Sequence, residues 1–200
     1  MGIVIKHLSK AFDGKPVLTD FSCELPENGV VALMGKSGIG KSTLINLLLG
    51  LRKPDSGAIQ LPPGTRFSAV FQEDRLFAHL SARENLLLTT GRKLSDIDAA
   101  LTALSLNPEE KSPVRTYSGG MQRRVALARG VLFEADVLLM DEPFRGLDPE
   151  TREQAIFFVR REWASRLIIL VTHDLEEARM MGANRIITIG GSNDEQYGIS

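Results

Sequence analysis

The chain has 200 residues, of which 43% are hydrophobic and 24% charged, a composition typical of a soluble globular protein. Its 24 basic and 25 acidic residues give a net charge of −1, so no overall field favours nucleic acid or an anionic membrane. A single cysteine, Cys23, excludes an internal disulfide and favours a reducing compartment. Every apolar run is shorter than a membrane span, and the N-terminus lacks the layout of a secretory signal. We therefore expect one α/β domain over residues 1–200, made and kept in the cytoplasm.

The first segments of the chain predict strands. Residues 3–8 are expected to form one strand and 17–25 a second, with a turn over 12–16 between them. A third, apolar strand over 30–34 leads into a glycine-rich loop. Two early strands before this one predict an antiparallel layer beside a parallel core. Phe12 either stacks on a base or is an ordinary core or edge aromatic.

The glycine-rich segment that follows has the pattern of a phosphate-binding loop opening a helix. Glycines let the backbone bend close to phosphates, and the helix adds the positive end of its dipole. We expect Lys41 to reach the β- and γ-phosphates of a nucleoside triphosphate and Ser42 to ligate Mg²⁺. The predicted nucleotide-binding residues of this segment are Gly35, Lys36, Ser37, Gly38, Ile39, Gly40, Lys41, Ser42 and Thr43.

The chain after the loop helix returns to strands. Residues 51–57 have turn chemistry, and 58–61 and 66–71 are expected to be strands. Gln72 ends the second of these strands. A polar residue there is placed to face the γ-phosphate, although many glutamines at strand ends are simply solvated.

A helical pattern then extends from residue 73 to about residue 130 and predicts a helical subdomain over about 74–130. Ser81 and Glu84 form a capping-box pattern, and Ser95 is expected to cap a second helix. A Ser/Gly-rich segment then opens another helix, which makes it a second candidate anion site. A chain of this size has little use for two nucleotides, and one way to reconcile the two sites is that the second serves the nucleotide of another copy. Its residues are Ser118, Gly119, Gly120 and Met121.

An apolar strand over 137–142 ends in two acids, and buried carboxylates are costly without a metal or hydrogen-bond donors. Beside a phosphate loop, we expect Asp141 to hold the water shell of Mg²⁺ and Glu142 to accept a proton from an attacking water. The alternative is an exposed Asp-Glu-Pro turn. Residues 145–149 are expected to form a turn that leads into a helix with core-facing apolar residues.

Another buried strand, over 167–171, precedes His173, which is placed to donate a hydrogen bond to the γ-phosphate. Asp174 is expected to cap the next helix. Residues 186–189 predict the last strand, and the polar segment from Gly190 predicts a tail.

With these motifs, the chain resembles the nucleotide-binding subunit of an ATP-binding cassette transporter over nearly its whole length. The resemblance implies a P-loop NTPase core with a mostly parallel sheet, an N-terminal antiparallel β layer and an inserted α-helical subdomain. It also implies ATP and Mg²⁺ as ligands. The matching motifs, in the order of the family, are a Walker A loop at 35–42, a Q-loop at Gln72, a signature at 118–122, a Walker B strand at 137–142, a D-loop around Asp148 and a switch histidine at His173.

In this family two subunits pair head to tail, and each ATP lies between the Walker A loop of one copy and the signature of the other. The resemblance therefore implies a homodimer when ATP is bound. Phe12 falls where the family has an aromatic, usually Tyr, that stacks on adenine. The catalytic residues implied are Lys41, Gln72, Glu142 (as general base) and His173, and the implied Mg²⁺ ligands are Ser42, Gln72 and Asp141.

Segments 71–76, 140–144 and 171–178 are similar to those of bacterial importers, most of all the nitrate, sulfonate and taurine group. This likeness implies that ATP hydrolysis drives a separate transmembrane permease from the inner face of the cell membrane. A periplasmic or lipid-anchored substrate-binding protein would be reached through the permease. The apolar residues after Gln72 either line the surface that receives the permease or belong to the helical core; they are Leu76, Phe77 and Leu80.

The chain departs from the family pattern at several positions. Tyr117 and Met121 replace the commonest Leu and Gln of the signature, and Arg123 stands where Gln is usual. Arg145 and Gly146 replace the small pair before the D-loop. The chain also ends early for this family, so we expect no control by a C-terminal regulatory domain.

Two other classes of protein use a similar phosphate loop. A soluble cassette ATPase acting on ribosomes or DNA usually carries tandem cassettes or long insertions, and this chain has neither. Its near-zero net charge gives no nucleic-acid footprint, so no nucleic-acid partner is expected. A small-molecule kinase would not explain the second Ser/Gly-rich segment.

Overall fold

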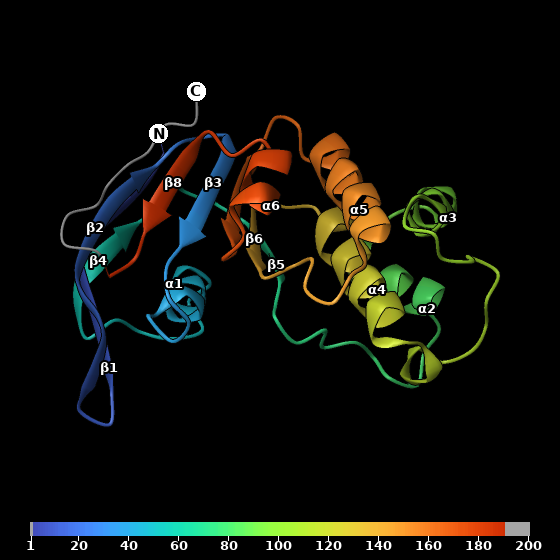
Figure 1. Cartoon of the computed structure of the whole chain (residues 1–200), viewed down its shortest axis with the longest axis horizontal. Helices are drawn as coiled ribbons and strands as arrows, with labels where there is room; N and C mark the ends of the chain where they lie inside the picture. Colours follow the sequence, from blue (N-terminus) through green and yellow to red (C-terminus); the bar gives the residue numbers. More distant parts are fainter. Residues whose placement is uncertain (1, 191–200) are drawn as a thin grey trace.

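The computed structural model describes residues 2–190 (Figure 1). Its central sheet has five strands, all parallel, in the order β5-β6-β7-β3-β8. Strands β6 and β7 are buried along their whole length, which explains why their sequences are continuous apolar runs, broken only by Asp141 at the end of β6. These strands are β3 (Gly29–Met34), β5 (Phe67–Val70), β6 (Val137–Asp141), β7 (Leu167–Val171) and β8 (Arg185–Thr188).

A second, antiparallel sheet of three strands has the order β2-β1-β4 and confirms the predicted antiparallel layer. Its strands are β1 (Ile3–Phe12), β2 (Lys15–Leu25) and β4 (Ser56–Gln60). The predicted turn over 12–16 is wrong in its length, because Phe12 pairs with Lys15 and only Asp13 and Gly14 turn. Both turn residues have positive φ, 49° and 75°, as the favoured two-residue hairpin turns require.

Helix α1 (Lys41–Leu48) lies between the two sheets (Figure 1) and packs its apolar residues into a core shared with β1 and β2. The other face of the parallel sheet is covered by α4 (Gly119–Leu132), α5 (Pro149–Glu162) and α6 (Leu175–Met180). Successive residues of β3 alternate between these two cores. Val31 and Leu33 belong to the core around α1, and Val30 and Ala32 belong to the opposite one.

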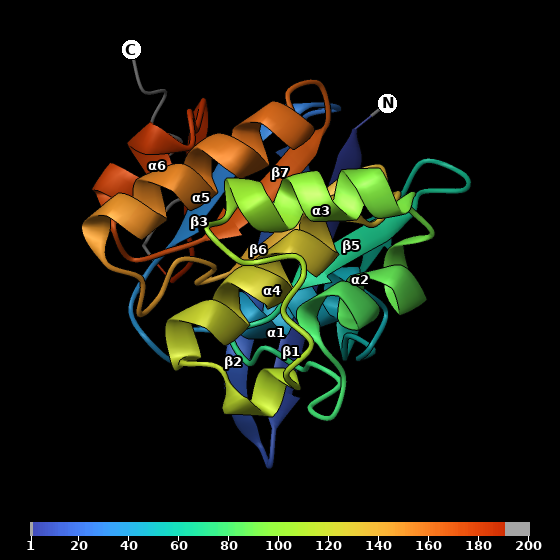
Figure 2. The ribbon, with the colours of Figure 1, turned by 90° about the vertical axis from the view of Figure 1, so that its right-hand side faces the viewer.

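Figure 2 looks onto the helical side of the molecule, where α2 (Ala82–Thr90), α3 (Leu94–Ala103) and α4 lie side by side. A 3₁₀ turn (Val114–Thr116) precedes α4. The helical pattern begins later than predicted, since residues 73–80 contain no helix. The capping box at Ser81 is confirmed, with the Glu84 carboxylate 2.7 Å from the Ser81 backbone nitrogen.

The predicted cap at Ser95 is wrong. A cap at Ser95 would start the helix at Asp96, but α3 begins two residues earlier, at Leu94, and its N-cap is Lys93, whose backbone is extended. Ser95 therefore lies within the first turn, where its hydroxyl is 3.3 Å from the Asp96 carboxylate. The predicted cap at Asp174 is confirmed, because its carboxylate accepts from the backbone N–H of Glu176 at 2.8 Å. The tail predicted after Gly190 lies outside the described residues.

Candidate functional site

The loop between β3 and α1 uses glycines where neighbouring backbone comes close. Gly35 and Gly40 have φ values of 143° and 110°. A Cβ atom at Gly35 would lie 2.9 Å from the Ile189 carbonyl oxygen, and one at Gly40 would lie 2.8 Å from the Val17 carbonyl oxygen. The residue after β8 and the strand β2 thus lie against the two ends of the loop, and no other residue type fits there without a shift.

The start of α1 leaves backbone N–H groups available to bind an anion. Its N-cap is Gly40, so no side chain accepts a hydrogen bond from the first N–H groups, and its first turn contains no acidic residue. Lys41 is only 8% exposed, and its ammonium donates to the carbonyl oxygens of Gly35 at 2.8 Å and Lys36 at 3.0 Å. These bonds hold the positive charge against the loop.

A cavity of about 200 Å³ lies in front of this loop and brings three distant segments together. The loop, the residue after β5 and the carboxyl end of β6 all contribute, as expected for a site at the carboxyl ends of parallel strands. The remaining loop residues lie outside the lining: Ile39 packs against the core around α1, and Gly35 and Lys36 provide the carbonyls that Lys41 meets. The lining residues are Ser37, Gly38, Gly40, Lys41, Ser42, Thr43, Gln72, Asp141 and Glu142.

A larger cavity, about 410 Å³, lies at the opposite ends of the strands, where β6 and β7 begin. Its lining includes the carboxylates of Glu27 and Asp136 together with Pro62 and Pro63. The smaller cavity contains Lys41 and the start of α1, which suit a phosphate ligand, so it is the better candidate for the nucleotide despite its size.

The two acids at the end of β6 have different surroundings. Asp141 is 6% exposed, and burial raises the pKa of its carboxyl above the ordinary value, opposed by a hydrogen bond from Ser42. Glu142 adopts a positive φ of 47°, which is strained for this residue type, and its N–H donates to the Val171 carbonyl at 2.9 Å. The chain therefore turns sharply between a buried carboxylate and one that faces the cavity.

Three side chains from different loops surround the Glu142 carboxylate. His173 Nδ1 lies 3.5 Å from Oε1, and Gln72 Nε2 lies 3.5 Å from Oε2. Arg145 Nη1 lies 3.8 Å from Oε2 and forms an ion pair with it. In the sequence alone, Arg145 is only a departure from the family pattern. The predicted grouping of Gln72, Glu142 and His173 is thus present.

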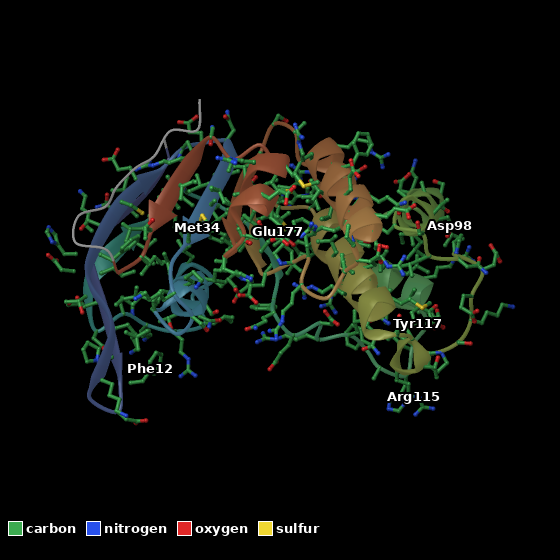
Figure 3. The ribbon with its side chains drawn as sticks, viewed as in Figure 1. Phe12, Met34, Asp98, Arg115, Tyr117 and Glu177 are labelled. Carbon is green, nitrogen blue, oxygen red and sulfur yellow. The ribbon has the colours of Figure 1, made fainter. Side chains whose placement is uncertain are left out.

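Phe12 lies outside the cavity lining, at the end of β1 (Figure 3). Phe12 is 37% exposed, with Lys10 Nζ 5.5 Å and Arg52 Cζ 5.7 Å from its ring centroid. Lys10 is also held by Asp55 at 2.6 Å. The ring is thus accessible for stacking and is surrounded by positive charge.

The second Ser/Gly-rich segment lies far from the first in one chain. Ser118 caps α4 and accepts from the Met121 N–H at 3.3 Å, while Ser118 and Gly119 remain exposed. Figure 3 shows Tyr117, which precedes this segment, and Met34, which precedes the phosphate loop, in opposite halves of the molecule. The two anion sites therefore do not form one pocket within one chain.

Asp148 and Arg123 each hold a neighbouring segment of backbone through side-chain hydrogen bonds. Asp148 caps α5, accepting from the Thr151 N–H at 3.0 Å, and that bond lowers the pKa of its carboxyl. Arg123 is buried under the site, where it contacts the backbone of both Gln72 and Glu142. Sequence reasoning did not find this role; the only signal was a charge at a position where the family usually has Gln.

Over residues 2–190, the structure contains no helix whose length and apolar character would allow it to cross a membrane.

Comparison with known proteins supports the family resemblance that the sequence motifs indicate. A family model described as "ABC transporter" matches residues 18–145. The thiamine import ATP-binding protein ThiQ of Mesorhizobium japonicum is 39% identical over 94% of this chain and 81% of its own length. The taurine import ATP-binding protein TauB of Jannaschia sp. is 35% identical over 93% and 77%, and the aliphatic sulfonates import ATP-binding protein SsuB 1 of Shouchella clausii 33% identical over 100% and 82%.

A solved structure of similar fold is the dimeric post-hydrolysis state of the ATP-binding cassette MJ0796 bound to ADP and Pi. It superposes with a TM-score of 0.84 at 24% identity and covers 99% of both chains. The likeness confirms the predicted fold class.

Proposed function

The chain belongs to the ATP-binding cassette transporter family, and we propose that it hydrolyses ATP to drive a separate membrane permease in solute import. The observation that carries the proposal is the cavity that joins the loop before α1 to Gln72 and the two acids of β6. A cation, a set of free helix N–H groups and a candidate base meet there, which is the combination that phosphoryl transfer to water requires.

The phosphate-binding part of the mechanism rests on the loop. The N–H groups at the start of α1 and the Lys41 ammonium bind the β- and γ-phosphates. Ser42 and Asp141 present the hard oxygen ligands that suit Mg²⁺, with Gln72 beside them, and these residues would hold the ion. When bound, Mg²⁺ neutralises charge that develops on the transferred phosphoryl group.

The hydrolytic part rests on Glu142, which accepts a proton from the attacking water. At the same time the oxygen of that water bonds to the γ-phosphorus. The bond from that phosphorus to the bridging oxygen breaks, and ADP leaves with the electron pair. His173 and Gln72, each 3.5 Å from a different oxygen of Glu142, hold its carboxylate and reach the γ-phosphate and the water.

The signature residues act on a second copy of the chain. Ser118, Gly119, Gly120 and Met121 form the start of α4, where Ser118 and Gly119 are exposed, and they lie far from the phosphate loop of the same chain. A head-to-tail homodimer places them against the nucleotide of the partner, with the D-loop around Asp148 beside the interface. Phe12 stacks on the adenine of the nucleotide bound to its own chain.

The partner on the membrane side is a permease, and the place of action is the cytoplasmic face of the membrane. The relatives import taurine, sulfonates or thiamine by their names. Because these solutes differ in chemistry, we assign solute selection to the permease and to any substrate-binding protein that it engages. Phe77 is 49% exposed and suits a surface that receives the permease, whereas Leu76 packs against the helical core.

The test is the Glu142→Gln variant of the full chain. We expect its ATPase rate to fall by about 10²–10⁴-fold while ATP still binds, so that an ATP-dependent dimer accumulates in size-exclusion chromatography. Glu153→Gln, which changes an exposed glutamate of α5, is the matched control and should behave as the wild type. Wild-type turnover by Glu142→Gln would remove Glu142 from its role.

A second arm of the same experiment tests the partner. The tagged Glu142→Gln chain is recovered from solubilised membranes, and the bound proteins are identified. A multi-span membrane protein in stoichiometric amount supports the transporter function. Recovery of ribosomal or DNA-repair proteins would favour a soluble cassette ATPase instead.

A further inference from the structure

Arg123 lies on α4, is 4% exposed, and donates hydrogen bonds from all three of its guanidinium nitrogens. Nη1 faces the segment after β5, where it meets the Phe71 carbonyl at 2.6 Å, the Gln72 carbonyl at 3.4 Å and the Asp74 carboxylate at 3.0 Å. The other two nitrogens face the end of β6. Nη2 donates to the carbonyls of Asp141 at 3.2 Å and Glu142 at 2.8 Å, and Nε donates to that of Pro143 at 2.7 Å.

This guanidinium is thus a bridge between two segments that carry the proposed catalytic groups. It contacts the backbone of Gln72 and Glu142, whose side chains lie 3.5 Å apart in the cavity. A planar guanidinium has five N–H donors in a rigid fork, so it fixes the positions of its acceptors relative to one another. A glutamine side chain has only two N–H donors and could not bind all of these acceptors.

We propose that Arg123 is a positioning residue for hydrolysis, which sets the separation of Gln72 and Glu142 by holding the backbone of both from α4. The proposal rests on the proposed role of Glu142 as general base. The positive φ of Glu142 strengthens it, because a strained turn keeps its shape only where surrounding bonds hold it, and Arg123 supplies two of these at the carbonyls of Glu142 and Pro143.

A second, half-buried arginine of α4 provides the comparison. Arg129 donates to the carbonyls of Asp74 at 2.9 Å and Arg75 at 2.7 Å, so it holds the same loop after β5. Within residues 2–190, its side-chain hydrogen bonds do not reach the end of β6. If hydrolysis requires an arginine that bridges both segments, replacing Arg123 should slow it. Replacing Arg129, which holds only the loop after β5, should not.

The experiment compares Arg123→Gln and Arg123→Lys with the matched control Arg129→Gln in the full chain. Thermal unfolding, MgATP affinity and single-turnover ATP hydrolysis are measured for each. We expect both Arg123 variants to fold and bind MgATP as the wild type does, to hydrolyse it about 10²-fold more slowly, and to accumulate the ATP-bound dimer. Lys fails to rescue because one ammonium cannot serve acceptors on both segments. Arg129→Gln is expected to keep the wild-type rate.

The double variant Arg123→Gln/Glu142→Gln separates positioning from general damage. If Arg123 acts through Glu142, the double variant hydrolyses ATP no more slowly than Glu142→Gln alone. The proposal would be overturned if adding Arg123→Gln to Glu142→Gln slowed hydrolysis by the same factor as Arg123→Gln does alone. Wild-type turnover by folded Arg123 variants would overturn it as well. Unfolding or loss of MgATP binding in both Arg123 variants would overturn it too, since Arg123 would then act through stability. An inactive Arg123→Gln beside a fully active Glu142→Gln would refute the general-base role itself.

Discussion

Replacing Gly40 by Ala should destabilise the protein more than the same change at Gly38, although both glycines belong to the phosphate loop. At Gly40, φ is 110°, and a new Cβ would lie 2.8 Å from the Val17 carbonyl oxygen and 3.0 Å from Leu18 Cδ2. At Gly38, φ is 80°, and nothing lies within 4 Å of a new Cβ. The pair therefore separates backbone strain from steric overlap.

The magnitudes follow from these two terms. A left-handed backbone costs an L-residue about 1–2 kcal/mol, and this applies to both variants. Overlap with well-packed atoms adds about 1–3 kcal/mol, and this applies to Gly40→Ala alone because β2 cannot move away without breaking its pairing with β1. We expect the free energy of unfolding to fall by about 2–5 kcal/mol for Gly40→Ala and by about 1–2 kcal/mol for Gly38→Ala.

Urea unfolding followed by the fluorescence of Trp163, the only tryptophan and 1% exposed, measures both values. ATP affinity is titrated in parallel, and Gly38→Ala should weaken it despite the smaller loss of stability, because its methyl group enters the cavity. Equal losses of stability in the two variants would refute the reasoning, since β2 would then not restrain the loop.

Two further predictions concern a buried acid and the exposed ring. Burial raises the pKa of Glu177 above 4.5, opposed by a hydrogen bond from Thr172 at 2.7 Å. A raised folded-state pKa gives stability that is present below the unfolded value and is lost as the pH rises through the folded value. The free energy of unfolding should therefore fall less above pH 4.5 for Glu177→Gln than for the wild type. Urea unfolding at several pH values measures this, and parallel curves for both proteins would contradict it. Phe12→Ala should weaken ATP binding by about 1–3 kcal/mol in a fluorescent-nucleotide titration, while Phe133→Ala, also an exposed aromatic, should not; equal affinities in all three proteins would exclude stacking.

Much of the site could be predicted from the sequence because its parts are local patterns. The loop at 35–42 shows its strand, glycines and helix within one stretch of chain, and the acids at the end of 137–142 follow an uninterrupted apolar run. Since carboxyl ends of parallel strands meet at one edge of a sheet, these patterns also predict that the loop, Gln72 and Glu142 come together.

The remaining features depend on contacts between distant segments. Arg123 binds mostly backbone carbonyls, which every residue has, so its role leaves no pattern of partner residues in the sequence. The extent of β1 to Phe12 depends on pairing with Lys15, although the Asp-Gly pair between them is itself a hairpin signal. Helix α3 begins before Ser95 because the chain leaves α2 at Gly91, where φ is 64°, and Lys93 is already extended.

The distance between the phosphate loop and the start of α4 has a genetic consequence. In the proposed head-to-tail pair, one chain with a defective Lys41 and another with a defective Ser118 would still assemble one complete site, from the Lys41 of the second chain and the Ser118 of the first. Each defect alone leaves a pair with both sites damaged. Two inactive alleles can thus complement each other, whereas two alleles damaged in the same loop cannot.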